Sequence, residues 1–113
     1  MKSKPTEPQI RAEYRALARQ LARPGWISHG YVQNRGPGAG GPCYQWTRKE
    51  RGKTVSVALS KEQYEWMVKA VANWQNIQAT LLRMQQLSRT FMFQTLQDTI
   101  RRKPLSRKVM GTI

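Results

Sequence analysis

The feature that most constrains the fold of this chain is a change of hydrophobic period at Ser60. Before it, the stretches "PCYQWTRK" and "KTVSVALS" alternate in the way strands do, and "ERG" joins them. Gly52 in that loop supplies the positive φ that a short hairpin needs. After Ser60, apolar residues recur every three or four positions, which is typical of an amphipathic helix. The sequence therefore predicts a β-hairpin that leads directly into a helix.

The alternation divides the hairpin into two faces. The face expected to pack on the helix carries Tyr44, Trp46, Arg48, Val55, Val57 and Leu59. The opposite face is polar and partly cationic, with Gln45, Thr47, Lys49, Thr54, Ser56 and Ala58. The aromatic rings of Tyr31, Tyr44 and Trp46 could stack on unpaired bases, as in proteins that bind single strands or RNA. Because Tyr44 and Trp46 share the apolar face, we expect those two rings in the core instead.

The helix after the hairpin is predicted to be unusually long. Ser60 and Gln63 form a capping box, and no proline follows until Pro104. A helix over residues 61–101 would span roughly 60 Å at ~1.5 Å per residue. A globule of this chain length is only about 25–30 Å across. The far half is therefore expected either to bend back near "LSRT" or to pack on another chain.

The far half of this helix also carries more apolar side chains than the rest of the chain is expected to cover. The segment "LLRMQQLSRTFMFQTL" contains two Met and two Phe, which suit adaptable hydrophobic contacts. If these apolar side chains were exposed to solvent, they would favour aggregation. We expect a homodimer or docking on a larger protein, through a partner interface made of Leu81, Met84, Leu87, Phe91, Met92 and Leu96.

A shorter helix is predicted before the sheet. The segment "QIRAEYRALARQLARPG" has apolar residues at helical spacing and ends at Pro24-Gly25. The stretch from Trp26 to Arg35 is predicted as a first strand. The fold class is thus α+β: an N-terminal helix, a small three-stranded antiparallel sheet and a long C-terminal amphipathic helix. The expected organisation is a disordered tail over 1–8, a single helix-hairpin-helix domain over 9–101 and a basic C-terminal tail over 102–113.

Charge is the main functional signal in the sequence. The 113 residues include 20 Lys and Arg but only 6 Asp and Glu, a formal net charge of +14. Self-repulsion of this size opposes compaction. A phosphate backbone is the commonest partner that relieves it, because binding releases condensed counterions. An acidic membrane surface ranks second and an acidic protein third.

The cations gather in three segments: the first helix, the hairpin and the C-terminal tail. In the first helix, Arg11, Arg15, Arg19 and Arg23 stand four residues apart. This spacing drifts by only about 40° per repeat, so the four side chains form one stripe. We expect five cations to cluster at one end of the hairpin: Arg35, Arg48, Lys49, Arg51 and Lys53. This two-stranded ribbon can enter a major groove, while a solvated, charged hairpin tip is the alternative. The predicted phosphate-binding residues are Arg11, Arg15, Arg19, Arg35, Arg48, Lys49, Arg51, Lys53, Arg101, Arg102, Lys103, Arg107 and Lys108.

The sequence offers little material for catalysis. His29 is the sole histidine and Asp98 the sole aspartate, and no carboxylates stand at metal-binding spacing. A nucleophile pair of Cys43 and His29 has nothing to orient it. The "GKT" at Gly52 lies in a hairpin and not at a strand-to-helix turn, which disfavours a nucleotide-binding loop. We therefore expect no enzyme, no metal and no cofactor.

The same composition bears on location. A single cysteine excludes an intramolecular disulfide, and no apolar run approaches the ~20 residues of a membrane span. The start "MKSKPTEPQ" lacks the apolar segment of a secretory signal. A cytoplasmic protein that does not enter membranes is expected.

Three stretches carry a resemblance to a known family. They are "HGYVQNR" (29–35), "GPCYQWTRKERGKTVSVAL" (41–59) and "SKEQYEWMVKAVANWQNIQATLLRMQQLS" (60–88). They resemble a family of small, functionally uncharacterised bacterial proteins often encoded beside transposases, over about half to two-thirds of the chain. The resemblance implies a fold and a mobile-element context but no catalytic activity. Those relatives carry several cysteines in the loop that reads "GPGAGGP" here, so a metal-linked role is not expected of this loop.

The preferred hypothesis is a non-catalytic nucleic-acid-binding accessory subunit of a mobile-element or other nucleoprotein complex, with DNA and RNA both open. A second hypothesis is an adaptor that docks through its C-terminal helix on a transposase or nuclease. Truncation after Gln86 would then abolish partner binding and spare nucleic-acid affinity. A third is a small DNA-binding repressor or antitoxin, which requires a dimer with two-fold half-sites.

Overall fold

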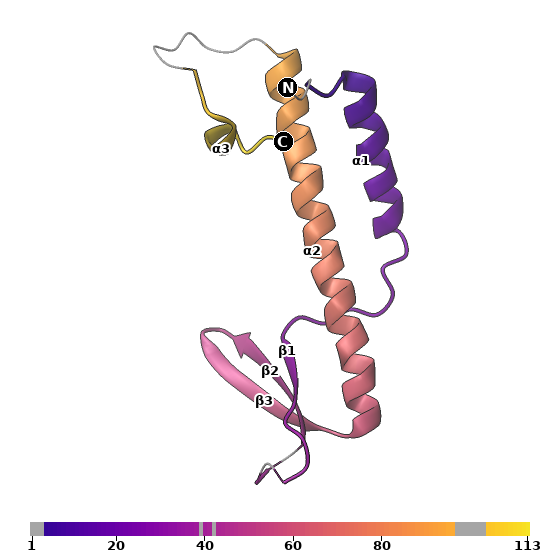
Figure 1. The fold of residues 1–113 in the computed structure, drawn as a ribbon, viewed down its shortest axis with the longest axis vertical. Helices are drawn as coiled ribbons and strands as arrows, with labels where there is room; N and C mark the ends of the chain where they lie inside the picture. Colours follow the sequence, from indigo (N-terminus) through magenta and orange to yellow (C-terminus); the bar gives the residue numbers. More distant parts are fainter. Residues whose placement is uncertain (1–3, 39, 42, 97–103) are drawn as a thin grey trace. The chain divides into compact units, whose positions relative to one another are not determined.

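The computed structural model describes residues 4–38, 40–41, 43–96 and 104–113 and has an α+β fold (Figure 1). An N-terminal helix, a three-stranded antiparallel sheet and a long helix follow one another, as the sequence predicted. The elements in order are α1 (Glu7–Leu21), β1 (Tyr31–Asn34), β2 (Tyr44–Glu50), β3 (Lys53–Leu59), α2 (Lys61–Thr95) and the short α3 (Arg107–Met110).

The chain divides into two compact units, whereas one domain over 9–101 was expected. The helical unit comprises Met1–Arg23 with Gln78–Ile113, and the sheet unit comprises Pro24–Ile77. Helix α2 contributes its N-terminal part to the sheet unit and its C-terminal part to the helical unit.

Helix α1 begins earlier than its apolar pattern suggested. A capping box starts it: the Gln9 N–H donates to Thr6 Oγ1 (3.3 Å), and the Thr6 N–H donates to Gln9 Oε1 (2.8 Å). Pro8 in the first turn costs no helical hydrogen bond. The expected disordered tail over 1–8 is therefore wrong for its last two residues, which are helical.

The sheet has the order β1-β2-β3, with both pairs antiparallel. Trp46 on the central strand lies opposite Val32 on one side and Val57 on the other. The β2–β3 turn places Arg51 at φ 49° and Gly52 at φ 80°, the geometry of a tight hairpin and the role predicted for Gly52.

Strand β1 is shorter than predicted. The predicted strand ran from Trp26 to Arg35, but its first residues pair with α2 instead of the sheet. The Ser28 N–H donates to the Ala70 carbonyl (3.2 Å), and Asn73 Nδ2 donates to the Trp26 carbonyl (2.9 Å). Because these backbone groups already have partners on the helix, they are not available for a β ladder.

The inner face of the sheet is the apolar face that the alternation predicted. The Tyr44 ring packs on Tyr64 of α2, with centroids 4.7 Å apart. Trp46 Nε1 donates to the His29 carbonyl (2.9 Å), and the Arg48 guanidinium lies 4.4 Å from the centroid of the Trp46 ring. Tyr44 and Trp46 are therefore packing residues, as expected.

Helix α2 runs unbroken through "LSRT", so the predicted alternative of a bend there is wrong. The hydroxyls that could have disturbed the helix bond within it: Ser88 and Thr90 each donate to the carbonyl four residues earlier, at 2.9 Å. The C-terminal half of α2 packs against α1. Ile10 and Leu87 are 4% and 1% exposed and form the apolar centre of the helical unit.

The C-terminal residues fold back on α2. The Ile113 N–H donates to Thr90 Oγ1 (3.1 Å), and Gly111 ends α3 in the left-handed conformation at φ 68°. The C-terminus accordingly lies beside α2 in Figure 1. The expected basic tail over 102–113 thus contains a helical turn held to the helical unit; Arg101, Arg102 and Lys103 lie outside the described residues.

Candidate nucleic-acid interface

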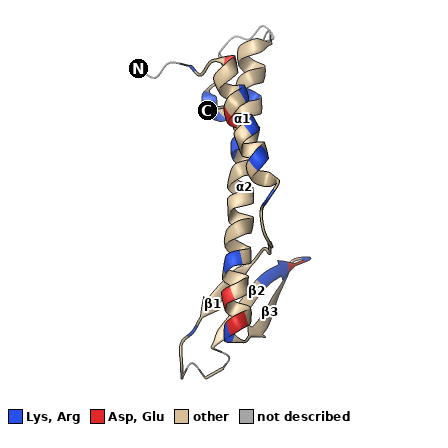
Figure 2. Cartoon of the chain, turned by 90° about the vertical axis from the view of Figure 1, so that its right-hand side faces the viewer, with Lys and Arg blue, Asp and Glu red and all other residues tan. Residues whose placement is uncertain are grey.

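Positive charge is concentrated in the helical unit. Of the sequence's 20 Lys and Arg, 13 belong to this unit, against 3 of the 6 acidic residues, which gives it a formal charge of +10. The sheet unit holds the other 7 cations and 3 acids, a formal charge of +4. Figure 2 shows the Lys and Arg residues along α1 and near the β2–β3 turn.

The arginine stripe of α1 is exposed, but its members differ in what they contact. Arg11 Nε donates to Glu7 Oε1 (3.0 Å), and its guanidinium lies 4.9 Å from the Phe91 ring centroid. Arg15, Arg19 and Arg23 form no ion pair with the described residues. The sequence placed Arg23 in the helical stripe, but α1 ends at Leu21, so Arg23 lies two residues beyond the helix, where it is exposed. Among the described residues, Arg15 and Arg19 on α1 and Arg23 just after it are therefore left without an acidic partner.

Glu13, the second glutamate of α1, forms an ion pair with α2 inside the helical unit. Arg83 on α2 donates to Glu13 through Nε (2.5 Å) and Nη2 (3.0 Å), a two-point ion pair between the helices. The hydrogen bond from Arg83 lowers the pKa of Glu13; partial burial opposes this and the positive charge adds to it. The same hydrogen bond, which the Glu13 carboxylate accepts, raises the pKa of Arg83. Arg83 is therefore a structural cation.

This ion pair predicts an acid-dependent loss of stability. Because the folded-state pKa of Glu13 lies below its ordinary 4.5, the pair stabilises the fold fully above that pH and loses its contribution as the pH falls through the folded value. Both side chains are more than one-third exposed, so we expect under about 1 kcal/mol. Urea unfolding of Glu13→Gln should show this loss at pH 7 and a smaller loss at about pH 3, because Glu13 becomes protonated as the pH falls below its ordinary pKa. A constant difference at both pH values would contradict the assignment.

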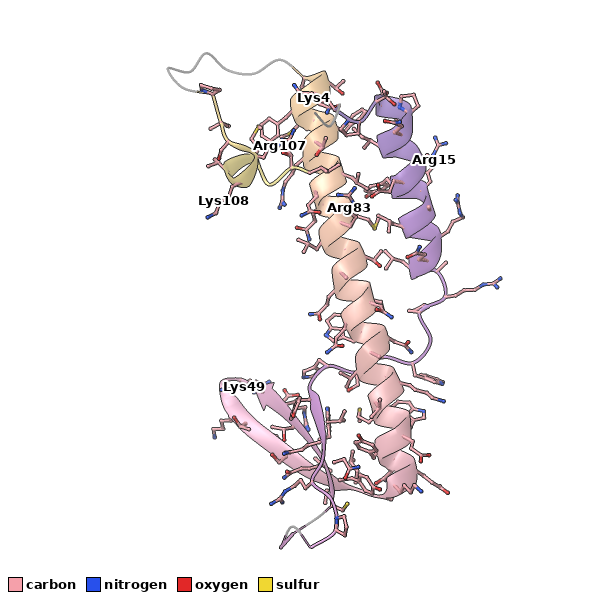
Figure 3. All side chains as sticks on the ribbon, in the orientation of Figure 1. Lys4, Arg15, Lys49, Arg83, Arg107 and Lys108 are labelled. Atoms are coloured by element: carbon pink, nitrogen blue, oxygen red, sulfur yellow. The ribbon has the colours of Figure 1, made fainter. Side chains whose placement is uncertain are left out.

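The C-terminal cations lie apart from the stripe. Arg107 and Lys108 on α3 are exposed, and Figure 3 shows them on the opposite side of α2 from Arg15. Arg89 on α2 donates to Gln85 Oε1 (3.3 Å). The cations of the described residues thus lie on two sides of α2 and do not form one continuous face.

The candidate cations of the β2–β3 hairpin separate into two groups. Lys49, Arg51 and Lys53 are exposed around the β2–β3 turn without an ion pair to the described residues. Arg48 is already ion-paired within the sheet: its Nε donates to Glu50 Oε1 (3.0 Å), and its side chain is only 22% exposed. The prediction of Arg48 as a phosphate contact is corrected to a packing role over Trp46.

Arg35 does not belong to the hairpin tip. It follows β1, where its N–H donates to the Cys43 carbonyl (2.7 Å) just before β2 begins. The tip lies at the other end of β2, about 20 Å away at ~3.3 Å per residue. The prediction that Arg35 clusters with the tip cations is therefore wrong.

Among the three aromatic residues considered for base stacking, Tyr31 is the one the fold exposes. It is 63% exposed and lies opposite Thr47, on the outer face of the sheet that also carries Lys49. The Thr47 and Ser56 hydroxyls lie 3.0 Å apart on that face. The outer face is thus polar, with one aromatic ring near the basic tip.

The predicted partner interface on α2 is divided by the packing of α1. Leu87 is core, and Met84 and Phe91 are half-buried. Leu81, Met92 and Leu96 remain 40%, 41% and 65% exposed, and Leu82, which the sequence pattern missed, is 55% exposed. Leu87 is therefore corrected from an interface residue to a core residue.

The residues considered for metal binding and catalysis have contacts of their own. No three His, Cys, Asp or Glu side chains come together as a metal site in the part of the chain that the structure describes. The Cys43 thiol donates to Asn34 Oδ1 (3.6 Å), and the His29 ring packs edge-on against Trp46. None of the described helices is long and apolar enough to cross a membrane.

Comparisons with protein-family models, with curated proteins and with solved structures gave no match to this chain.

Proposed function

We propose that this protein is a non-catalytic nucleic-acid-binding accessory subunit of a mobile-element-associated or other nucleoprotein complex. The observation that supports the proposal is the uncompensated positive charge on α1 and just after it. The described side-chain carboxylates of the helical unit are already ion-paired: Glu7 with Arg11, and Glu13 with Arg83. Arg15, Arg19 and Arg23 are left without an acidic partner among the described residues.

A polyanion is the partner that this arrangement fits best. Like charges four residues apart on a helix repel and weaken it. Phosphates placed along the stripe would remove that repulsion, and the release of their condensed counterions would favour binding. Because arginine contacts to the backbone carry no sequence information, they would position the protein on DNA or RNA without selecting a base.

The sheet unit offers a second contact surface. Lys49, Arg51 and Lys53 surround the tip of a two-stranded ribbon narrow enough for a major groove. Tyr31 on the outer face could stack an unpaired base. A single cysteine, Cys43, fits the reducing cytoplasm in which such a complex would act.

The test compares two triple variants of equal charge. We expect Arg15→Gln, Arg19→Gln and Arg23→Gln together to weaken binding to a labelled oligonucleotide roughly 100-fold or more at 0.1 M salt, because three phosphate contacts are lost. Fluorescence anisotropy with duplex DNA, single-stranded DNA and RNA would measure the loss and rank the ligands.

The matched control replaces Lys4, Lys61 and Lys69 with glutamine. These exposed lysines lie outside the arginine stripe, and their removal lowers the net charge by the same amount. We expect a loss below about tenfold from the weaker general attraction. Equal losses in both variants would mean that total charge and not the α1 stripe governs binding.

The alternative function is a protein-interaction adaptor, favoured by the exposed apolar residues Leu81, Leu82, Met92 and Leu96 on α2. Truncation after Gln86 would not isolate this role, since it removes Leu87 from the core that α1 covers. Substitution of Met92 and Leu96 with glutamine leaves that core intact. Under the adaptor hypothesis these changes weaken partner binding and spare the affinity for oligonucleotides.

A further inference from the structure

We infer that the helical unit accepts an acidic amphipathic helix of a partner protein in a groove between α1 and α2. This helical groove has an apolar floor made of Ile10, Tyr14, Leu87 and Phe91, and Arg11 and Arg15 line its α1 edge. It has a volume of about 260 Å³ and opens to solvent. The inference does not rest on nucleic-acid binding.

The floor of the helical groove lies between two antiparallel helices, where a third helix can pack. Contacts of Glu13 with Arg83 and of Arg11 with Phe91 show that α1 and the C-terminal part of α2 run antiparallel. Two antiparallel helices leave a hydrophobic furrow on each side, and a third helix packs into one to complete a bundle. Tyr14, at 39% exposed, remains uncovered in the floor.

The apolar surface continues past the α2 edge of the groove. Ser88 forms that edge, and Leu81 and Met92 stand seven residues before it and four after it. These spacings place the three residues on one side of α2. Leu81 and Met92 are each about 40% exposed, so an amphipathic helix in the groove would also cover them.

The positive charge at the edge of the helical groove favours an acidic partner over the other possible occupants. Among the described residues, no carboxylate lines the helical groove, and its charged lining residues are Arg15 and Arg11, the second of which also pairs with Glu7. A second copy would bring another formal +10 against these arginines, which repels. A nucleic acid would supply negative charge but little aliphatic surface for the floor. A helix with one leucine face and flanking glutamates supplies both.

The probe for the test is a synthetic fluorescent peptide about three heptads long, with leucine along one face and glutamate elsewhere. Two control peptides accompany it: one of the same composition with the leucines redistributed around the helix, and one with lysine in place of glutamate. Titrated against the full chain, the probe should bind at least about tenfold more tightly than either control. Equal binding of the redistributed peptide would overturn the inference, because charge alone would then explain it.

Variants of the chain locate the site. Arg15→Glu reverses the charge at the groove edge, and Ser88→Trp fills the groove from an exposed position. Each should weaken peptide binding about tenfold or more. The matched control is Arg19→Glu, which makes the same charge change one turn along α1 at a residue that does not line the groove; it should have less than about a threefold effect.

Circular dichroism at the assay temperature confirms that each variant is folded before its binding is measured. Peptide affinity that is unchanged in a folded Ser88→Trp variant, or that falls equally in Arg15→Glu and Arg19→Glu, would overturn the inference. Oligonucleotide affinity should fall alike in the two arginine variants, since both belong to the stripe of α1. The two proposals can therefore fail separately.

Discussion

Replacement of Leu87 with alanine is expected to lower the free energy of unfolding of the helical unit by about 3 kcal/mol. Leu87 is 1% exposed and, with Ile10, forms the apolar centre between α1 and α2. Loss of a buried leucine removes its transfer free energy and leaves a cavity, which together cost about 2–5 kcal/mol. Urea unfolding followed by circular dichroism would measure the difference.

The matched control is Leu81→Ala on the same helix. Leu81 is 40% exposed, so the same truncation should cost under about 1 kcal/mol in the isolated protein. Equal losses at the two positions would contradict the packing of α1 on the C-terminal part of α2. They would also restore Leu87 to the partner interface that the sequence predicted.

Replacement of Gly30 with alanine is expected to destabilise the sheet unit by about 3 kcal/mol or more. Gly30 has φ 114°, a conformation that residues with a side chain rarely adopt. A Cβ there would collide with Trp46 Nε1 and would lie 2.8 Å from the Thr47 carbonyl oxygen. The collision would displace Trp46 from its hydrogen bond to the His29 carbonyl. Tryptophan fluorescence during urea unfolding would report the change.

Gly38→Ala is the control for the backbone effect alone. Gly38 also has a positive φ, 78°, but nothing lies within 4 Å of a Cβ built on it. Its replacement should cost only about 1–2 kcal/mol. An alanine at Gly30 that costs no more than one at Gly38 would contradict the close packing of Trp46 beneath this glycine.

The elements of the fold were predictable because their signals are local. The alternation of 44–59 gave both hairpin strands, and Gly52 gave the turn. The start of α1 was also present in the sequence, since Thr6 and Gln9 have the capping-box spacing. The length of β1 was not predictable from alternation, because Trp26 and Ser28 bond to residues of α2 more than 40 positions away.

The candidate site was predicted less well, since it depends on which groups meet in space. The sequence shows that Arg48 is cationic but not that Glu50 and Trp46 engage it. It places Arg35 near the hairpin in sequence, while a full strand separates Arg35 from the tip. Likewise, the period of α2 marks Leu87 as apolar but does not say that α1 covers it. The net charge is therefore the property of the candidate site that could be predicted from the sequence alone.

The proposal that uncompensated arginines on α1 and just after it bind phosphates is tested by the salt dependence of oligonucleotide affinity. Anisotropy titrations from ~50 to ~200 mM NaCl would give the slope of log association constant against log salt. If about six phosphates are neutralised, the slope should be near −5, and it should flatten by about 2.7 when Arg15, Arg19 and Arg23 become glutamine. A slope near zero in the unmodified protein, or one that the three substitutions leave unchanged, would contradict the account.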